Sequence, residues 1–132
     1  MRIAHLAIIE GLALASLLLP TAASAGERAE RSNVGSATCY LFSYFIDNGQ
    51  DGLHLAWSEN GYTWKALKSG QSFLTPMVGE GKLMRDPSLL RGVDGTFHMV
   101  WTTSWKGKTI GYASSADLTH WSQQRAIEVM AN

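Results

Sequence analysis

The fold of this chain is decided by a sequence that occurs twice. The first copy, residues 40–64, reads YLFSYFIDNGQDGLHLAWSENGYTW, and the second, residues 97–121, reads FHMVWTTSWKGKTIGYASSADLTHW. The copies lie 57 positions apart and align without a gap, so that an alternating aromatic run begins each copy and a tryptophan ends it. A repeat of this length is one supersecondary unit that cannot bury its apolar face alone. We therefore expect the two copies to stack on each other.

Each copy contains short runs of aromatic and β-branched residues that are separated by turn signals. The pair Asp94-Gly95 predicts a hairpin that joins Pro87–Leu90 to Thr96–Thr102, because such a pair accommodates the positive φ angles of a tight turn. Further strands are expected at 109–114 and 126–130. After residue 40, apolar residues never keep helical spacing for three turns. The sequence predicts an all-β domain with four antiparallel strands per repeat, like a blade of a β-propeller.

The first 25 residues resemble a secretory signal peptide. A positive charge at Arg2 precedes the apolar run Gly11–Leu19 and a small-residue cleavage site at Ala23-Ser24-Ala25. The alternative is an uncleaved membrane anchor, but a span needs ~18 apolar residues. We therefore expect a secreted or periplasmic protein.

Residues 26–38 are polar and small, and they predict a linker before the propeller domain at 39–132. Because this linker directly precedes the first copy, we expect that copy to lack the first strand of its blade. About two four-stranded blades are therefore expected, which is too few to close a propeller. We interpret the chain as an N-terminal portion of a longer protein.

Charge and cysteine content restrict the possible partners. The chain has 11 basic and 11 acidic residues, of which Arg2 and Glu10 lie in the predicted signal. The remaining 107 residues therefore contain ten basic and ten acidic residues. This balance gives no bias toward nucleic acid or an anionic membrane, and the single Cys39 excludes a disulfide framework. The sequence has no phosphate-binding Gly-rich motif and no histidine or cysteine pair at metal-ligand spacing. We expect a neutral partner, no cofactor, no metal, no nucleic acid and no stable membrane association.

The candidate for chemistry is Arg85-Asp86-Pro87, which opens the inner strand of the complete blade. Inner strands begin at the central channel, and Pro87 restricts the backbone there, so the Asp86 carboxylate would project from a rigid position. A structural role, in which Asp86 caps a turn or pairs with Arg85, stays open. Trp105 lies in a loop, at the position where the first copy has Asn48, and its ring either stacks on a ligand or only packs within the loop.

Trp64 and Trp121 occupy the same repeat position, so we expect both to pack between blades rather than bind a ligand.

Three stretches together resemble a known family: MRDPSLL at 84–90, DGTFHMVWT at 94–102 and IGYASSADLTHW at 110–121. They are similar to the Asp-Pro blade and the Ser-x-Asp-Leu-x-x-Trp turn of the five-bladed propeller glycosidases, closest to glycoside hydrolase family 43 and its arabinosidase-like relatives. The resemblance covers the chain from Tyr40 onward.

This resemblance implies inverting hydrolysis of a poly- or oligosaccharide that contains arabinose or xylose. It assigns Asp86 as the general base and assigns no role to any other residue. From their positions in the chain we further expect Arg85 and Trp105 to contact the substrate, with the Trp105 ring stacked on a sugar. The general acid and the second Asp of the family would lie beyond Asn132. Because inversion needs an acid and a base ~6.5–9.5 Å apart, we expect the chain by itself to be inactive.

Three other interpretations stay open. Fructan-cleaving propellers also carry an Arg-Asp-Pro, but their nucleophilic Asp lies one blade earlier, where this chain has Ala29. A non-catalytic carbohydrate-binding propeller would use Asp86 only to hydrogen-bond a sugar. A truncated reading frame would have no function.

Overall fold

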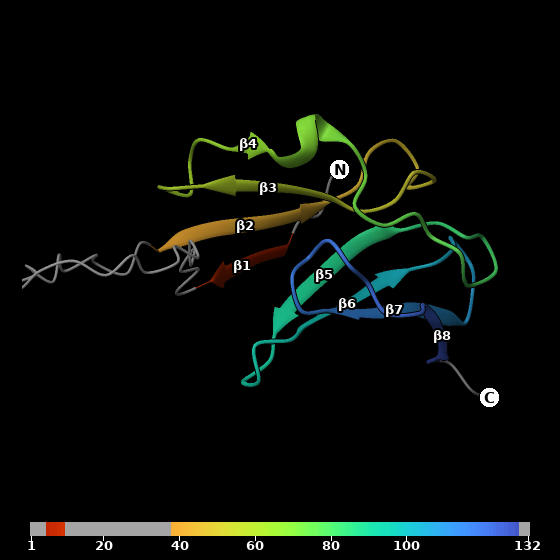
Figure 1. The fold of residues 1–132 in the computed structure, drawn as a ribbon. Helices are drawn as coiled ribbons and strands as arrows, with labels where there is room; N and C mark the ends of the chain where they lie inside the picture. The colour runs from red at the N-terminus through yellow and green to blue at the C-terminus, as the bar shows by residue number, and fades with distance from the viewer. Residues whose placement is uncertain (1–4, 10–37, 130–132) are drawn as a thin grey trace, which may run out of the picture.

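The computed structural model describes residues 5–9 and 38–129, which form two antiparallel sheets of four strands each (Figure 1). In both sheets the strands follow one another in chain order. The first sheet consists of β1 (His5–Ile9), β2 (Cys39–Tyr44), β3 (His54–Ser58) and β4 (Lys65–Ala66), after which comes the short 3-10 helix η1 (Leu67–Gly70). The second sheet consists of β5 (Arg85–Arg91), β6 (Phe97–Thr102), β7 (Thr109–Ser115) and β8 (Arg125–Glu128). The all-β prediction is confirmed.

The repeat holds at the level of strand register. In the first sheet Tyr40 pairs with Ser58. In the second sheet Phe97 pairs with Ser115, and both of these residues lie 57 positions later. The predicted hairpin joins β5 to β6, and of its Asp94-Gly95 pair only Gly95 has a positive φ. The ungapped alignment of the two copies is therefore also a structural alignment.

The two β-turns that close the repeats are built alike. In each turn a serine Oγ accepts hydrogen bonds from the backbone N–H groups two and three residues later, at 3.2 and 2.8 Å. The closing tryptophan then donates its Nε1–H to the carbonyl three residues earlier, at 3.1 Å in both turns. The serines are Ser58 and Ser115, and the tryptophans are Trp64 and Trp121.

The core lies between the two sheets. It combines side chains from β2, β3, β5, β6 and β7 with those of the residues directly before β3 and β5, namely Leu41, Leu53, Leu55, Met84, Leu89, Phe97, Met99, Trp101 and Ala113. Trp121 packs against this core. Trp64 instead packs on Phe42, with ring centroids 5.1 Å apart. The equivalent tryptophans thus both pack, but against different partners.

The first sheet has a fourth strand, β1, ahead of β2, so the expectation that the first copy lacks its first strand is wrong. Strand β1 pairs with β2 from His5 opposite Ser43 to Ile9 opposite Cys39, and it lies beside β5 (Figure 1). This strand falls within the predicted signal peptide, which stays a prediction. The rest of the signal and nearly all of the linker at 26–38 lie outside the described residues. Among the described residues, no helix is long and apolar enough to cross a membrane.

Candidate functional site

Asp86 lies in a β-bulge at the start of β5. Arg85 pairs with Thr102 and the next regular pair is Ser88 with Val100, so two residues of β5, Asp86 and Pro87, oppose one residue of β6. Bulges of this kind change the direction of a side chain and are frequent beside active sites. The bulge therefore gives the Asp86 side chain a direction that a regular strand would not.

The backbone of Asp86 is in an unfavourable conformation. Its φ is +49°, in the left-handed region, and the proline that follows disfavours compact backbone conformations further. Within the described part of the chain, the Asp86 carboxylate makes no ion pair and accepts no hydrogen bond. The pairing with Arg85 that the sequence left open is therefore not observed. A strained backbone at a residue whose carboxylate has no partner among the described residues is typical of a functional position.

Neighbouring strands hold the bulge from both sides. Ser43 of β2, which is 2% exposed, donates its hydroxyl to the carbonyl oxygen of buried Pro87 at 2.8 Å. Trp101 of β6 lies opposite the bulge and is fully buried against Gly111 of β7. A Cβ at position 111 would overlap the Trp101 ring, so only glycine fits there. The strained backbone of Asp86 is thus fixed by tertiary contacts.

Arg85 and Trp105 form a stack beside Asp86. The Arg85 Cζ lies 3.4 Å from the centroid of the Trp105 ring and 5.5 Å from that of Phe45. Asn48 joins the two side chains, because its Oδ1 accepts hydrogen bonds from Arg85 Nη1 at 3.3 Å and from Trp105 Nε1 at 3.0 Å. Trp105 is nevertheless 71% exposed. One face of its ring is covered by the guanidinium, and the rest is open to solvent.

Asn48 is a site residue to which sequence reasoning assigned no role. Its signal was present, because Asn48 and Trp105 are one repeat apart and hold equivalent loop positions. The loop after β2 and the loop after β6 meet at the same end of the two sheets. The structure thus brings both predicted substrate contacts, Arg85 and Trp105, together beside the predicted base.

Glu80 fixes the loop that carries Trp105. Its carboxylate accepts hydrogen bonds from Thr109 Oγ1 at 2.6 Å, Lys108 N at 3.0 Å and Thr103 Oγ1 at 3.3 Å. These bonds, of which that from Thr109 is the strongest influence, lower the pKa of Glu80 from 4.5 to about 2. No motif in the sequence singles out Glu80. Because its partners lie on both sides of Trp105, Glu80 stabilises the loop from both ends.

Comparison with known protein families identifies the class of the chain. Residues 36–132 match a family described as a probable glycosyl hydrolase domain. The chain belongs to this family. The match includes both repeats and the Arg85-Asp86-Pro87 bulge, and it confirms the resemblance to family-43-like glycosidases. A comparison with curated proteins found no match.

For a glycosyl hydrolase domain, the site offers three chemically distinct groups. The Asp86 carboxylate can accept a proton, and the edge N–H groups of Arg85 can donate to sugar hydroxyls. The outer face of Trp105 can pack on the apolar face of a sugar ring. Among the residues that the structure describes, no three histidine, cysteine or acidic side chains are grouped as metal ligands.

Proposed function

We propose that this chain is part of a secreted or periplasmic glycoside hydrolase, built as a five-bladed β-propeller, that cleaves arabinose- or xylose-containing polysaccharides by inversion. One observation carries the proposal. The carboxylate of Asp86 has no partner among the described residues, yet its backbone is held at a positive φ in a bulge beside the Arg85–Trp105 stack. A carboxylate fixed in this way is suited to chemistry rather than to holding the fold.

In this mechanism Asp86 accepts a proton from a water molecule as the water attacks the anomeric carbon. The leaving oxygen departs from the opposite face of the sugar and takes its proton from a general acid ~6.5–9.5 Å from the base. We assign the acid to sequence outside these 132 residues. The chain alone should therefore bind sugar without turning it over.

The ring of Trp105 and the guanidinium of Arg85 would position the sugar. Because Trp105 covers the face of the guanidinium, Arg85 can donate hydrogen bonds only through its edge. Asn48 fixes the angle between the two groups through its shared oxygen. A sugar ring on the outer face of Trp105 would thus meet donors and the Asp86 carboxylate at its edge.

A non-catalytic carbohydrate-binding role is the second candidate. It is favoured by the completeness of the binding groups, since Asn48, Arg85 and Trp105 contact one another within this chain, whereas a single carboxylate cannot act as both acid and base.

The test uses the complete translation product of the gene that encodes this chain. Xylo- and arabino-oligosaccharides are supplied as substrates, and NMR identifies the anomer that forms first. Asp86→Asn should lower kcat by about 10²–10⁴ and leave KM nearly unchanged, because it removes basicity but preserves shape. Asp86→Ala should regain turnover when azide is added, because azide is already an anionic nucleophile and needs no base to remove a proton from it. Trp105→Ala should mainly raise KM.

Wild-type turnover in Asp86→Asn would remove Asp86 from the catalytic groups. Binding without hydrolysis by the complete product would establish the second candidate.

A further inference from the structure

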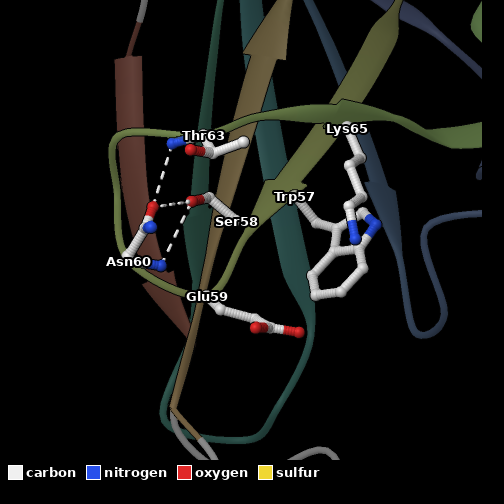
Figure 2. Close-up of a pocket in the computed structure, with 6 residues that line it drawn as sticks. All are labelled: Trp57, Ser58, Glu59, Asn60, Thr63 and Lys65. Atoms are coloured by element: carbon white, nitrogen blue, oxygen red, sulfur yellow. Dashed lines mark hydrogen bonds between the residues drawn. The ribbon is translucent and has the colours of Figure 1, made fainter.

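A separate hollow lies at the far end of the first sheet. It has a volume of about 210 Å³ and is lined by Trp57, Ser58, Glu59, Asn60, Thr63 and Lys65 (Figure 2). Asp86 and Trp105 lie where β2 ends and β3 begins, whereas this hollow lies where β3 ends and turns into β4. The two places are separated by the length of β3, so the hollow is not part of the candidate active site.

The walls of the hollow combine an aromatic ring with two opposite charges. Trp57 is paired across the strands with Lys65, whose Nζ lies 5.1 Å from the centroid of the indole ring. Glu59 extends its carboxylate to the same side of the turn as the indole (Figure 2). Neither Glu59 nor Lys65 makes a side-chain hydrogen bond or ion pair with the described residues. Both charged groups are therefore available to a ligand.

The other lining residues form a rigid floor. Ser58 Oγ accepts hydrogen bonds from the turn backbone, and Asn60 Oδ1 accepts them from the N–H groups of Tyr62 and Thr63, at 2.9 Å each. These bonds maintain the turn and occupy the small polar side chains. The floor thus holds its shape without help from Trp57, Glu59 or Lys65.

The second repeat provides an internal comparison. It has the same turn, in which Ser115 Oγ and Asp117 Oδ1 likewise accept hydrogen bonds from backbone N–H groups. At the positions equivalent to the three wall residues it has small side chains, namely Ser114, Ala116 and Ser122. The fold of the repeat therefore does not require an aromatic ring, a carboxylate and an ammonium group at these positions. Their presence in the first repeat alone points to binding.

We propose that this hollow binds one neutral sugar residue of a polysaccharide, as a second carbohydrate site distinct from Asp86. The indole offers a surface for the apolar face of a ring, while Glu59 accepts from hydroxyl groups and Lys65 donates to them. The two charges cancel, which favours an uncharged ligand. The volume of about 210 Å³ is far larger than a single water molecule needs and suits one sugar ring. The choice of sugar as ligand rests on the function proposed above.

The experiment follows the indole N–H signals of the 132-residue chain by NMR during titration with xylotriose or arabinotriose. The five tryptophans give separate signals, so the two sites are observed independently. We expect the Trp57 signal to shift with added sugar. A variant that combines Trp57→Ser, Glu59→Ala and Lys65→Ser carries the residues of the second repeat, so it should fold. Because it lacks the Trp57 signal, its binding is followed by calorimetry in a Trp105→Ala background, and affinity should fall about tenfold or more.

Glu59→Gln is the conservative variant, because it keeps the size of the side chain and leaves the Trp57 indole signal observable. It should weaken sugar binding and leave the Trp105 response unchanged. An unshifted Trp57 signal, a shift produced equally by acetate or ammonium ions, or full affinity in the triple variant would each overturn the proposal. These outcomes leave Asp86-dependent turnover untouched, and a loss of that turnover would not move the Trp57 signal, so the two proposals fail separately.

Discussion

The positive φ of Asp86 allows its effects on stability and activity to be separated. An L-residue in the left-handed region costs about 1–2 kcal/mol, and glycine avoids this cost but loses about 0.5–1 kcal/mol through its greater freedom in the unfolded chain. Among the described residues, the Asp86 carboxylate makes no hydrogen bond or ion pair that substitution would remove. Asp86→Gly should therefore raise the free energy of unfolding by about 0.5–1 kcal/mol, or Tm by roughly 2–8 °C. The same variant should be inactive.

Three further variants test the reasoning. Asp86→Asn should keep wild-type stability, because asparagine tolerates the left-handed region as aspartate does. Asp86→Ala should be less stable than Asp86→Gly, because it keeps the strain. Lys82 is exposed and has a φ of +46°, so Lys82→Gly is a matched control that should gain similar stability and retain activity.

The assay is urea unfolding of each variant followed by tryptophan fluorescence, and hydrolysis is measured for the same substitutions in the complete translation product. One result would refute the reasoning: Asp86→Gly and Asp86→Asn both lose more than about 1 kcal/mol while Lys82→Gly gains stability. The carboxylate would then hold the bulge in place, and its catalytic role would lose its support.

Ser43→Ala should lower the free energy of unfolding by about 1–3 kcal/mol, because it leaves the buried carbonyl of Pro87 without a donor, and unchanged urea stability would contradict this. Glu80 has a pKa of about 2 when folded, so its stabilising effect is present above its ordinary value of 4.5 and is lost as pH falls through 2. When thermal unfolding is measured at several pH values, Tm should fall less at acid pH in Glu80→Gln than in wild type. An equal fall in Tm in both proteins would refute this prediction. A chain that starts at Gly26 lacks β1 and exposes the edge of β2, so it should self-associate in sedimentation experiments, whereas a monomer with unchanged Tm would contradict this.

The repeat made much of the fold predictable. Alternation of Tyr40, Phe42 and Tyr44 sets one face of a strand, and Ser58 and Trp64 set the turn that follows, so the same pattern 57 residues later had to give the same register. These are short-range features that the sequence states directly. The strand positions were accordingly correct to within about one or two residues.

Three features could not be obtained in this way. The residue before a proline is normally extended, so the local rule gave no hint that Asp86 has a left-handed φ. Local rules fail most often at functional positions, where tertiary contacts impose the conformation. The contact of Asn48 with Arg85 and Trp105 joins loops from both repeats, which sequence distance does not reveal. Strand β1 was hidden because His5–Ile9 also reads as part of an apolar signal segment.

The way the two sheets stack explains why the candidate site lies between repeats. Phe97, Met99 and Trp101 of the second sheet face the first sheet. The residues equivalent to Phe97 and Met99 are Tyr40 and Phe42, which lie on the face of the first sheet that points away from the second sheet. The two sheets therefore contact each other through different faces, which is a head-to-tail arrangement. The outer face of each sheet is equivalent to the face that its neighbour uses in the contact between the sheets.

Such a contact can be continued by further units of the same kind, which supports the propeller that we propose. Each added unit would bring the loop after its second strand to the end of the sheets where Asn48 and Trp105 meet. Asp86 would then face side chains from several units. A reaction that requires a base, an acid and a substrate platform could therefore be assembled from one loop or bulge per repeat, with Asp86 as the contribution of the second.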